Sequence, residues 1–385
     1  MKNILTKNRF LMSASALTMA FSVSAQAMPK AKVENWGKLA DGQTVKSISL
    51  TNDRSITVRI ITYGGIIQSV ETPDKKGKIA NIALGFDSID GYVKNNKGAF
   101  FGAVLGRVAN RIANGTFTLE GKTYHTSVNE GQNTLHGGVE SFSRKFWTID
   151  DVGQDKNGAH VRLKLISPDG DQGFPGTVTA SVTYTLSNDN SLKARFQAQT
   201  DAPTIVNLTT HNYWNLLGEG SGTIEPEILQ IFADKFVETD AASLPTGKLV
   251  PVAGTALDFN KPHKISDHLR SKESQMIWPR GYDKCWVIKG EAVTGKLRPA
   301  AKLTDPRSGR VLEVYTDQPG MQFYTSNSLD GRYVGPSGQA YRQGDAVAFE
   351  PEHFPDSANH SNFPTIELKP GQSYDHVTIF KFSHN

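Results

Sequence analysis

The sequence predicts an all-β fold, a sandwich or barrel of antiparallel strands. Apolar and polar residues alternate over several short runs, which is the period of a strand with one buried face. Beyond the first 27 residues, no stretch of a dozen residues has the pattern of an amphipathic helix, and 35 Gly and 18 Pro residues interrupt the chain. Many short strands without crossover helices are typical of all-β architectures.

The N-terminal segment, residues 1–27, has the layout of a secretory signal peptide. Its apolar stretch, residues 10–23, follows three positive side chains, Lys2, Lys7 and Arg9, and leads to the small-residue pattern Ala25-Gln26-Ala27. The stretch is shorter than the roughly 18 residues that a membrane-spanning helix needs. We therefore expect cleavage near Ala27 and a periplasmic or secreted protein with no membrane association afterwards; the alternative is a retained N-terminal anchor.

The remaining chain, residues 28–385, is predicted to form a single domain, because no linker, composition break or internal repeat divides it. The formal net charge of +4 falls close to zero once the three positive charges of the signal segment are removed. A nearly neutral chain without a basic run offers no electrostatic basis for binding nucleic acid or an anionic membrane.

Cys285 is the only cysteine, so the chain can form no intramolecular disulfide, and its stability must come from a hydrophobic core. Cys285 lies between Lys284 and Trp286 in a strand-like run. We interpret it as a small buried hydrophobic residue in preference to a nucleophile.

The predicted strands follow one another with turn signals between them. Alternation is found at Ile56, Val58 and Ile60, over residues 161–165, over residues 178–186 and over residues 192–196. The last two runs are joined by Ser187-Asn188-Asp189-Asn190-Ser191, and residues 117–124 are predicted to form a hairpin that turns at Gly121-Lys122. Both connections indicate antiparallel pairing.

Several catalytic motifs are absent from the sequence. It contains no H-E-x-x-H, no paired C-x-x-C, no G-x-S-x-G and no G-x-x-x-x-G-K. The motifs that usually identify zinc peptidases, α/β-hydrolases and nucleotide-binding enzymes are therefore missing. Acidic residues and histidines gather between Glu350 and Asp356, with His360 and Glu367 beyond. Prolines in this segment prevent a regular helical face and the spacings match no metal pattern, so we expect neither a metal nor a cofactor.

Five segments concentrate side chains that a sugar site would use: residues 110–111, 135–138, 210–215, 281–283 and 319–324. A hexose presents a ring of hydroxyls, each both donor and acceptor, so its pocket needs Asn, Gln, Asp, Arg and His beside aromatic faces. Taken singly, such residues in β loops more often cap turns or bond to the backbone.

These segments resemble the aldose 1-epimerase family. The resemblance rests on Asn110-Arg111-Ile112-Ala113-Asn114-Gly115, Leu135-His136-Gly137-Gly138, Thr210-His211-Asn212-Tyr213, Pro319-Gly320-Met321-Gln322, and Phe363-Pro364 followed by Leu368-Lys369-Pro370-Gly371. It extends from about residue 35 to the C-terminus, with the motifs in the family's order. It implies a large antiparallel β-sandwich of the galactose mutarotase type and the interconversion of sugar anomers.

The resemblance also implies roles for two residues. His211, in the T-H-x-Y segment, would be the general acid on the ring oxygen, and Glu350 would be the general base on the C1 hydroxyl. Glu350 is preferred because the family glutamate precedes a segment ending in Pro-Asp, here Pro355-Asp356. Glu352 and Glu367 are the less favoured bases.

The same resemblance implies the ligands of the sugar hydroxyls: Asn110, Arg111, His136, Asp283, Gln322 and, as a weaker candidate, Tyr213. The alternative to a sugar-binding role is that Arg111 merely pairs with a carboxylate and that Asp283 caps a turn. Trp214 either narrows the pocket or packs in the core.

Three rival functions remain at this point. A non-catalytic sugar-binding β-sandwich would not need both an acid and a base, and a glycoside hydrolase would normally need two carboxyl groups about the scissile bond. An enzyme for phosphorylated hexoses would need an additional cluster of Arg or Lys. No motif indicates an oligomeric state or separates galactose from glucose, and we expect both sugars to be accepted.

Overall fold

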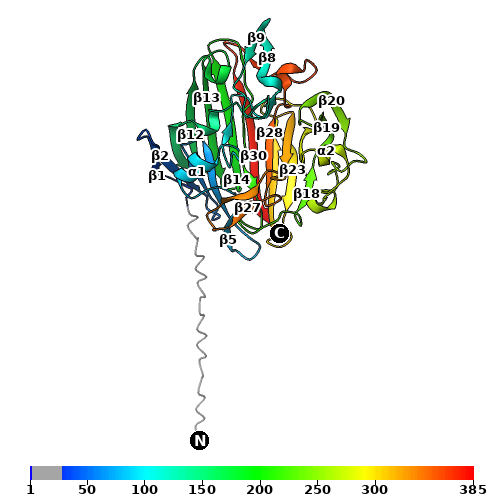
Figure 1. Cartoon of the computed structure of the whole chain (residues 1–385). Helices are drawn as coiled ribbons and strands as arrows, with labels where there is room; N and C mark the ends of the chain where they lie inside the picture. Colours follow the sequence, from blue (N-terminus) through cyan, green and yellow to red (C-terminus); the bar gives the residue numbers. More distant parts are fainter. Residues whose placement is uncertain (2–27) are drawn as a thin grey trace.

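Antiparallel strands make up most of the fold, and they form three large sheets and several two-stranded ones (Figure 1). The computed structural model describes residue 1 and residues 28–385. The predicted signal peptide lies outside the described residues, except for residue 1, so signal cleavage stays a prediction. Within residues 28–385 no helix is long and apolar enough to cross a membrane.

The largest sheet has nine strands, and the C-terminal strand lies in its middle (Figure 1). In spatial order its strands are β11 (Thr148–Asp155), β12 (Gly158–Ser167), β13 (Val178–Ser187), β14 (Ser191–Thr200), β30 (Tyr374–His384), β24 (Arg310–Thr316), β23 (Arg298–Thr304), β18 (Ile228–Ile231) and β21 (His263–Lys264). Strand β30 pairs with β14 on one side and β24 on the other. The C-terminus thus joins the two halves of the sheet.

Two further sheets complete the sandwich. The five-stranded sheet contains β1 (Lys30–Lys38), β2 (Thr44–Thr51), β3 (Thr57–Ile61), β4 (Ile66–Pro73) and β5 (Ile79–Asn81) in sequence order. The six-stranded sheet has the order β17 (Tyr213–Trp214), β28 (Val347–Glu352), β25 (Gly320–Tyr324), β22 (Asp283–Ile288), β19 (Ala233–Thr239) and β20 (Pro245–Pro251). The second of these carries four of the predicted site residues.

Short elements connect the sheets. Two-stranded pairs join β7 (Arg111–Ile112) to β10 (Thr134–Leu135), β6 (Val104–Leu105) to β16 (Thr209–Thr210), β15 (Thr204–Ile205) to β29 (Glu367–Leu368), β26 (Asp330–Val334) to β27 (Ala340–Arg342), and β8 (Thr116–Leu119) to β9 (Lys122–His125). Among residues 28–385 the α-helices are α1 (Ile89–Asn95), which Ser88 caps at its N-terminus, and the single turn α2 (Ser274–Ile277).

One apolar cluster fills the space between the large sheets. It includes Val58 from β3, Val182 from β13 and Phe323 from β25, each fully buried. Burying an apolar side chain of this size contributes about 1.5–3 kcal/mol. Because apolar and polar side chains alternate along each strand, each sheet contributes one apolar face to this core.

The predicted all-β fold and antiparallel sandwich are confirmed, and the predicted strands correspond to β3, β12, β13 and β14. The prediction for the hairpin turn was wrong by one residue: Leu119 pairs with Lys122, so the turn is Glu120-Gly121. Both turn residues have positive φ, 49° and 78°, as a tight hairpin turn requires.

Two single-residue interpretations are also settled. Cys285 is 2% exposed and packs with Val237, Phe354 and Phe363, as expected for a small buried hydrophobic residue. Trp214 is fully buried against Phe380 and Phe382, so it packs in the core.

Candidate active site

A cavity of about 380 Å³ opens beside the six-stranded sheet, and all eight predicted site residues line it. They come from six separate segments of the chain: Asn110, Arg111, His136, His211, Tyr213, Asp283, Gln322 and Glu350. The two rival bases do not line it: Glu352 is fully buried beside it, and Glu367 lines a different cavity.

His211 directly follows β16, and its backbone is fixed on both sides. Its N–H donates to the carbonyl of Ala103 and its carbonyl accepts from Gly102, both at 2.9 Å. The imidazole stacks on Tyr213 with ring centroids 4.8 Å apart and meets the ring of His136 edge-on at 5.4 Å. Aromatic neighbours therefore hold the ring in one orientation.

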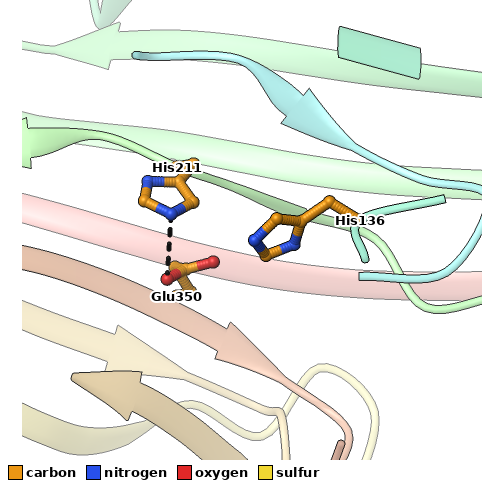
Figure 2. A group of neighbouring side chains, drawn as sticks. All are labelled: His136, His211 and Glu350. Carbon is orange, nitrogen blue, oxygen red and sulfur yellow. Dashed lines mark ion pairs between the residues drawn. The ribbon is translucent and has the colours of Figure 1, made fainter. Parts of the chain in front are cut away.

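Glu350 lies in β28, where it is paired across the sheet with Gln322 of β25. Its side chain is 2% exposed, and Oε1 lies 3.5 Å from Nε2 of His211 (Figure 2). Within residues 28–385, no group hydrogen-bonds the other carboxylate oxygen, Oε2. An acid–base pair with a free oxygen therefore faces the cavity.

Burial determines where the proton of this pair lies. Burial lowers the pKa of His211 to about 3. Burial, followed by the charges of Glu352 and Asp283, raises the pKa of Glu350 well above its ordinary value. Because both shifts disfavour charge, burial favours a protonated carboxyl beside a neutral imidazole.

His136 is held by glycines and by the backbone of Asn110. Gly137 has φ +88°, and a Cβ there would lie 2.0 Å from the carbonyl oxygen of Gly106, so this position requires glycine. The backbone N–H of Asn110 donates to Nδ1 of His136 at 3.1 Å. Burial, with smaller contributions from His211 and Arg111, lowers the pKa of His136. The neutral ring therefore carries its hydrogen on Nε2.

Three further charged or polar side chains, Arg111, Asp283 and Gln322, line the cavity. Arg111 makes a bidentate pair with Glu130, with both N–O distances 2.7 Å. Burial opposes the charge of Arg111, but Asp283 and Glu130 outweigh it and raise its pKa. Gln322 donates from Nε2 to Oδ1 of Asp283 at 2.5 Å. Arg111 thus both pairs with a carboxylate and lines the cavity. Asp283 accepts a hydrogen bond from the Gln322 side chain, whereas the alternative interpretation placed it as the cap of a turn.

Asn110 is already bonded within the protein. Its Nδ2 donates to Oε1 of Glu352 at 2.8 Å, and its Oδ1 accepts from the N–H of Arg111 at 3.0 Å. One amide hydrogen of Nδ2 remains for a ligand. Tyr213 is 2% exposed, and burial raises its pKa, so its hydroxyl is a donor.

His136, His211 and Glu350 could also be considered for a metal ion, since each offers one ligand atom and these atoms lie within 4.8 Å of one another. Two imidazoles and a carboxylate are a donor set that zinc accepts. However, Nδ1 of His136 accepts an N–H, so Nε2 carries the hydrogen and has no free lone pair. A ligating histidine normally donates from its second nitrogen, so the set does not fit a metal.

The sequence reasoning missed several residues of the wall. Glu130 follows no motif, and Phe100, which packs edge-on against His136 at 4.8 Å, precedes the first recognised segment. Trp278 and Arg280 belong to the connection between α2 and β22. The exposed tryptophan in this connection was the one available signal, and single exposed apolar residues are common on protein surfaces.

The chain is similar to sugar epimerases over almost its full length. The aldose 1-epimerase family model matches residues 46–381. The galactose mutarotase of Bos taurus is 43% identical over 340 residues, which are 88% of this chain and 94% of that protein. The aldose 1-epimerase of Escherichia coli strain K12 is 35% identical over 344 residues, 89% of this chain and 96% of that protein.

A solved structure has the same fold. The crystal structure of galactose 1-epimerase from Lactobacillus acidophilus NCFM has a TM-score of 0.81 at 28% sequence identity, covering 93% of this chain and 99% of that one.

Proposed function

This chain belongs to the aldose 1-epimerase family of isomerases, which interconvert sugar anomers, and we propose that it acts on free galactose and glucose with His211 as general acid and Glu350 as general base. The observation that carries the proposal is the 3.5 Å between Nε2 of His211 and Oε1 of Glu350 inside the cavity. The ring oxygen and the C1 hydroxyl oxygen are bonded to the same carbon, so an adjacent acid and base can reach both at once.

Ring opening transfers two protons in opposite directions. His211 gives a proton to the ring oxygen as the C1–O bond breaks, and Glu350 takes the proton of the C1 hydroxyl as the carbonyl forms. Rotation about the C1–C2 bond presents the other carbonyl face, and the reverse transfers close the ring as the other anomer. Electrons and protons balance without an oxidant, a metal or a covalent enzyme intermediate.

The effect of burial on the two side chains supports this cycle. Ring opening converts an imidazolium and a carboxylate into a neutral imidazole and a carboxylic acid. That product state has the protonation that burial favours, with the pKa of His211 lowered and that of Glu350 raised. Each well-positioned proton transfer typically contributes about a hundred-fold to ten-thousand-fold in rate.

Neutral hexoses fit the rest of the wall. Arg111, His136 and the Gln322–Asp283 pair supply donors and acceptors for the hydroxyls, and Asn110 and Tyr213 add donors. A phosphorylated sugar would need a cluster of positive side chains. Among the described residues, two arginines line the cavity, and Arg111 is already paired with Glu130.

Polarimetry of freshly dissolved α-D-galactose and α-D-glucose with the purified protein tests the activity. We expect a faster approach to the same final rotation than in a matched control without protein. Binding of galactose without any change in this rate would instead support a sugar-binding protein.

The role of His211 is tested against its neighbour. His211→Asn should lower kcat at least about a hundred-fold with KM little changed, whereas His136→Asn should act mainly on KM. If His211→Asn changed only KM, His211 would be a sugar ligand and His136 the remaining candidate acid.

We also propose that residues 1–27 direct export and that the exported protein begins near Met28, based on the sequence pattern alone. Determining the N-terminal sequence of the exported protein tests this. An intact N-terminus on that protein would contradict it.

A further inference from the structure

We propose that Glu352, which has no role in the proposed mechanism so far, is a positioning residue of this site. Its carboxylate fixes Asn110, and its negative charge keeps the transferred proton on the His211–Glu350 pair under alkaline conditions. The proposal rests on the assignment of Glu350 as the base.

Glu352 lies immediately behind the cavity wall. It is the last residue of β28 and is fully buried, two residues beyond Glu350. Side chains two apart in a strand point to the same face, about 6.6 Å from each other. The chain thus places a second carboxyl group beside the base but out of reach of the sugar.

The contacts of Glu352 lead to the sugar-facing residues through Asn110. Oε1 of Glu352 accepts from Nδ2 of Asn110 at 2.8 Å. The backbone N–H of Asn110 in turn donates to Nδ1 of His136, and its carbonyl accepts from the N–H of His136 at 2.9 Å. Asn110 has φ +62°, a left-handed conformation, so its orientation depends on such contacts.

The two carboxyl groups titrate as a coupled pair. Burial raises the pKa of Glu352 to about 8, while the N–H from Asn110 favours its charged form. Burial, followed by the charge of Glu352, raises the pKa of Glu350. The Glu352 carboxylate accepts a hydrogen bond from Asn110, whereas within residues 28–385 no group donates to Oε2 of Glu350. Glu352 therefore ionises first, and its charge then opposes loss of the proton from Glu350.

The other charged or titratable groups near the pair come from the neighbouring elements: Arg111 of β7, His136 after β10, His211 after β16, Tyr213 of β17, Asp283 and Cys285 of β22, Tyr324 of β25 and Tyr374 of β30. Of these, Arg111 lowers and Asp283 raises the pKa of both carboxyl groups. Removing the carboxylate of Glu352 leaves all of these groups in place, so its own effect can be isolated.

The test is the pH dependence of kcat/KM for Glu352→Gln, with the spontaneous rate subtracted at each pH. Glutamine keeps the acceptor for Asn110 and removes the charge. At a separation of about 6.6 Å, the lost repulsion should move the alkaline limb to lower pH by about one to two units. The acid limb should stay, because Glu352 is uncharged at low pH. An unchanged alkaline limb would overturn the proposal.

A matched control removes the same charge elsewhere. Glu367→Gln lies in β29, where the carboxylate pairs with Lys369 at 3.2 Å, and should move neither limb. Glu352→Ala tests the positioning role, because it also removes the acceptor for Asn110. We expect it to raise KM several-fold above that of Glu352→Gln, and equal KM values would remove Asn110 from the proposal.

A second measurement covers the case in which Glu352→Gln does not fold. Carbon NMR of labelled glutamate carboxyl groups in the wild-type protein should show the Glu352 signal titrating below that of Glu350. A Glu352 that stays protonated through the alkaline limb would overturn the proposal.

Failure of this proposal can be told apart from failure of the base assignment. If Glu350→Gln is inactive while Glu352→Gln has the wild-type profile, only the role of Glu352 is wrong. If Glu350→Gln is fully active, the base assignment is wrong.

Discussion

Glu350→Gln removes the proposed base while changing little else in the protein. Burial favours the protonated form of the Glu350 carboxyl by raising its pKa well above the ordinary value. Glutamine has nearly the shape and the charge of a protonated glutamate, so the substitution neither buries nor uncovers a charge. We therefore expect the free energy of unfolding to change by less than about 1 kcal/mol.

The chemical step should respond very differently. Glutamine cannot take the proton of the C1 hydroxyl, so kcat should fall about a hundred-fold to ten-thousand-fold, about 2.7–5.4 kcal/mol of transition-state stabilisation. KM should stay within a few-fold, because Gln322 keeps its hydrogen bond to Asp283 and Arg111 keeps its pair with Glu130. Turnover by polarimetry and sugar binding by calorimetry separate the two effects. Near-wild-type turnover would refute the role, and lost binding would show that Glu350 is mainly a ligand.

Four further predictions follow from individual contacts. The acid limb of the pH profile of kcat/KM should lie near pH 3, because gaining a second proton requires protonating His211, whose pKa is lowered to about 3. A limb near pH 6.5 would contradict this. Glu227→Gln should stabilise the protein against urea unfolding at pH 9 but not at pH 4.5. Burial raises the pKa of the Glu227 carboxyl to about 8, so between about pH 4.5 and 8 the folded state holds a proton that the unfolded chain loses. The free energy of unfolding of the wild-type protein therefore falls by up to about 5 kcal/mol as the pH rises through this range. Equal stabilisation at both values would be the contrary result. Glu130→Gln should raise KM about three- to ten-fold with kcat nearly kept, since the bidentate partner of Arg111 is lost, and an unchanged KM would show that Arg111 is held without it. Phe100→Ala should let water reach the two imidazoles and move the acid limb upward, which the same pH series would detect.

The sequence predicted the strands more reliably than the turns. The hairpin of β13 and β14 follows from strict alternation and a run of turn residues, and it forms with Leu186 paired to Leu192. The turn at Glu120-Gly121 was placed one residue late, because a glutamate at φ 49° is not the Asn or Asp that marks such turns. Local composition therefore indicates that a hairpin exists more clearly than where it turns.

The site depended on information that strand patterns do not contain. His211 and Glu350 are far apart in the chain, and only the resemblance to a family suggested that they meet; the structure brings them to 3.5 Å. Glu130 and Phe100 had no motif to mark them, although one holds Arg111 and the other packs on His136. Such supporting residues act through contacts between distant segments, which a single sequence does not reveal.

Burial links the shape of the cavity to its chemistry. In water an imidazole holds a proton more tightly than a carboxylate, so a His–Glu pair would rest as an ion pair. In this cavity His211 is 5% and Glu350 2% exposed, and burial reverses that order by penalising both charges. The charged form then depends on hydrogen bonds that a bound sugar supplies through its hydroxyls. In the proposed mechanism, an acid and a base of this strength would consequently coexist only while a sugar occupies the cavity. The same exclusion of water that shifts both groups would protect the open-chain aldehyde between the two proposed proton transfers.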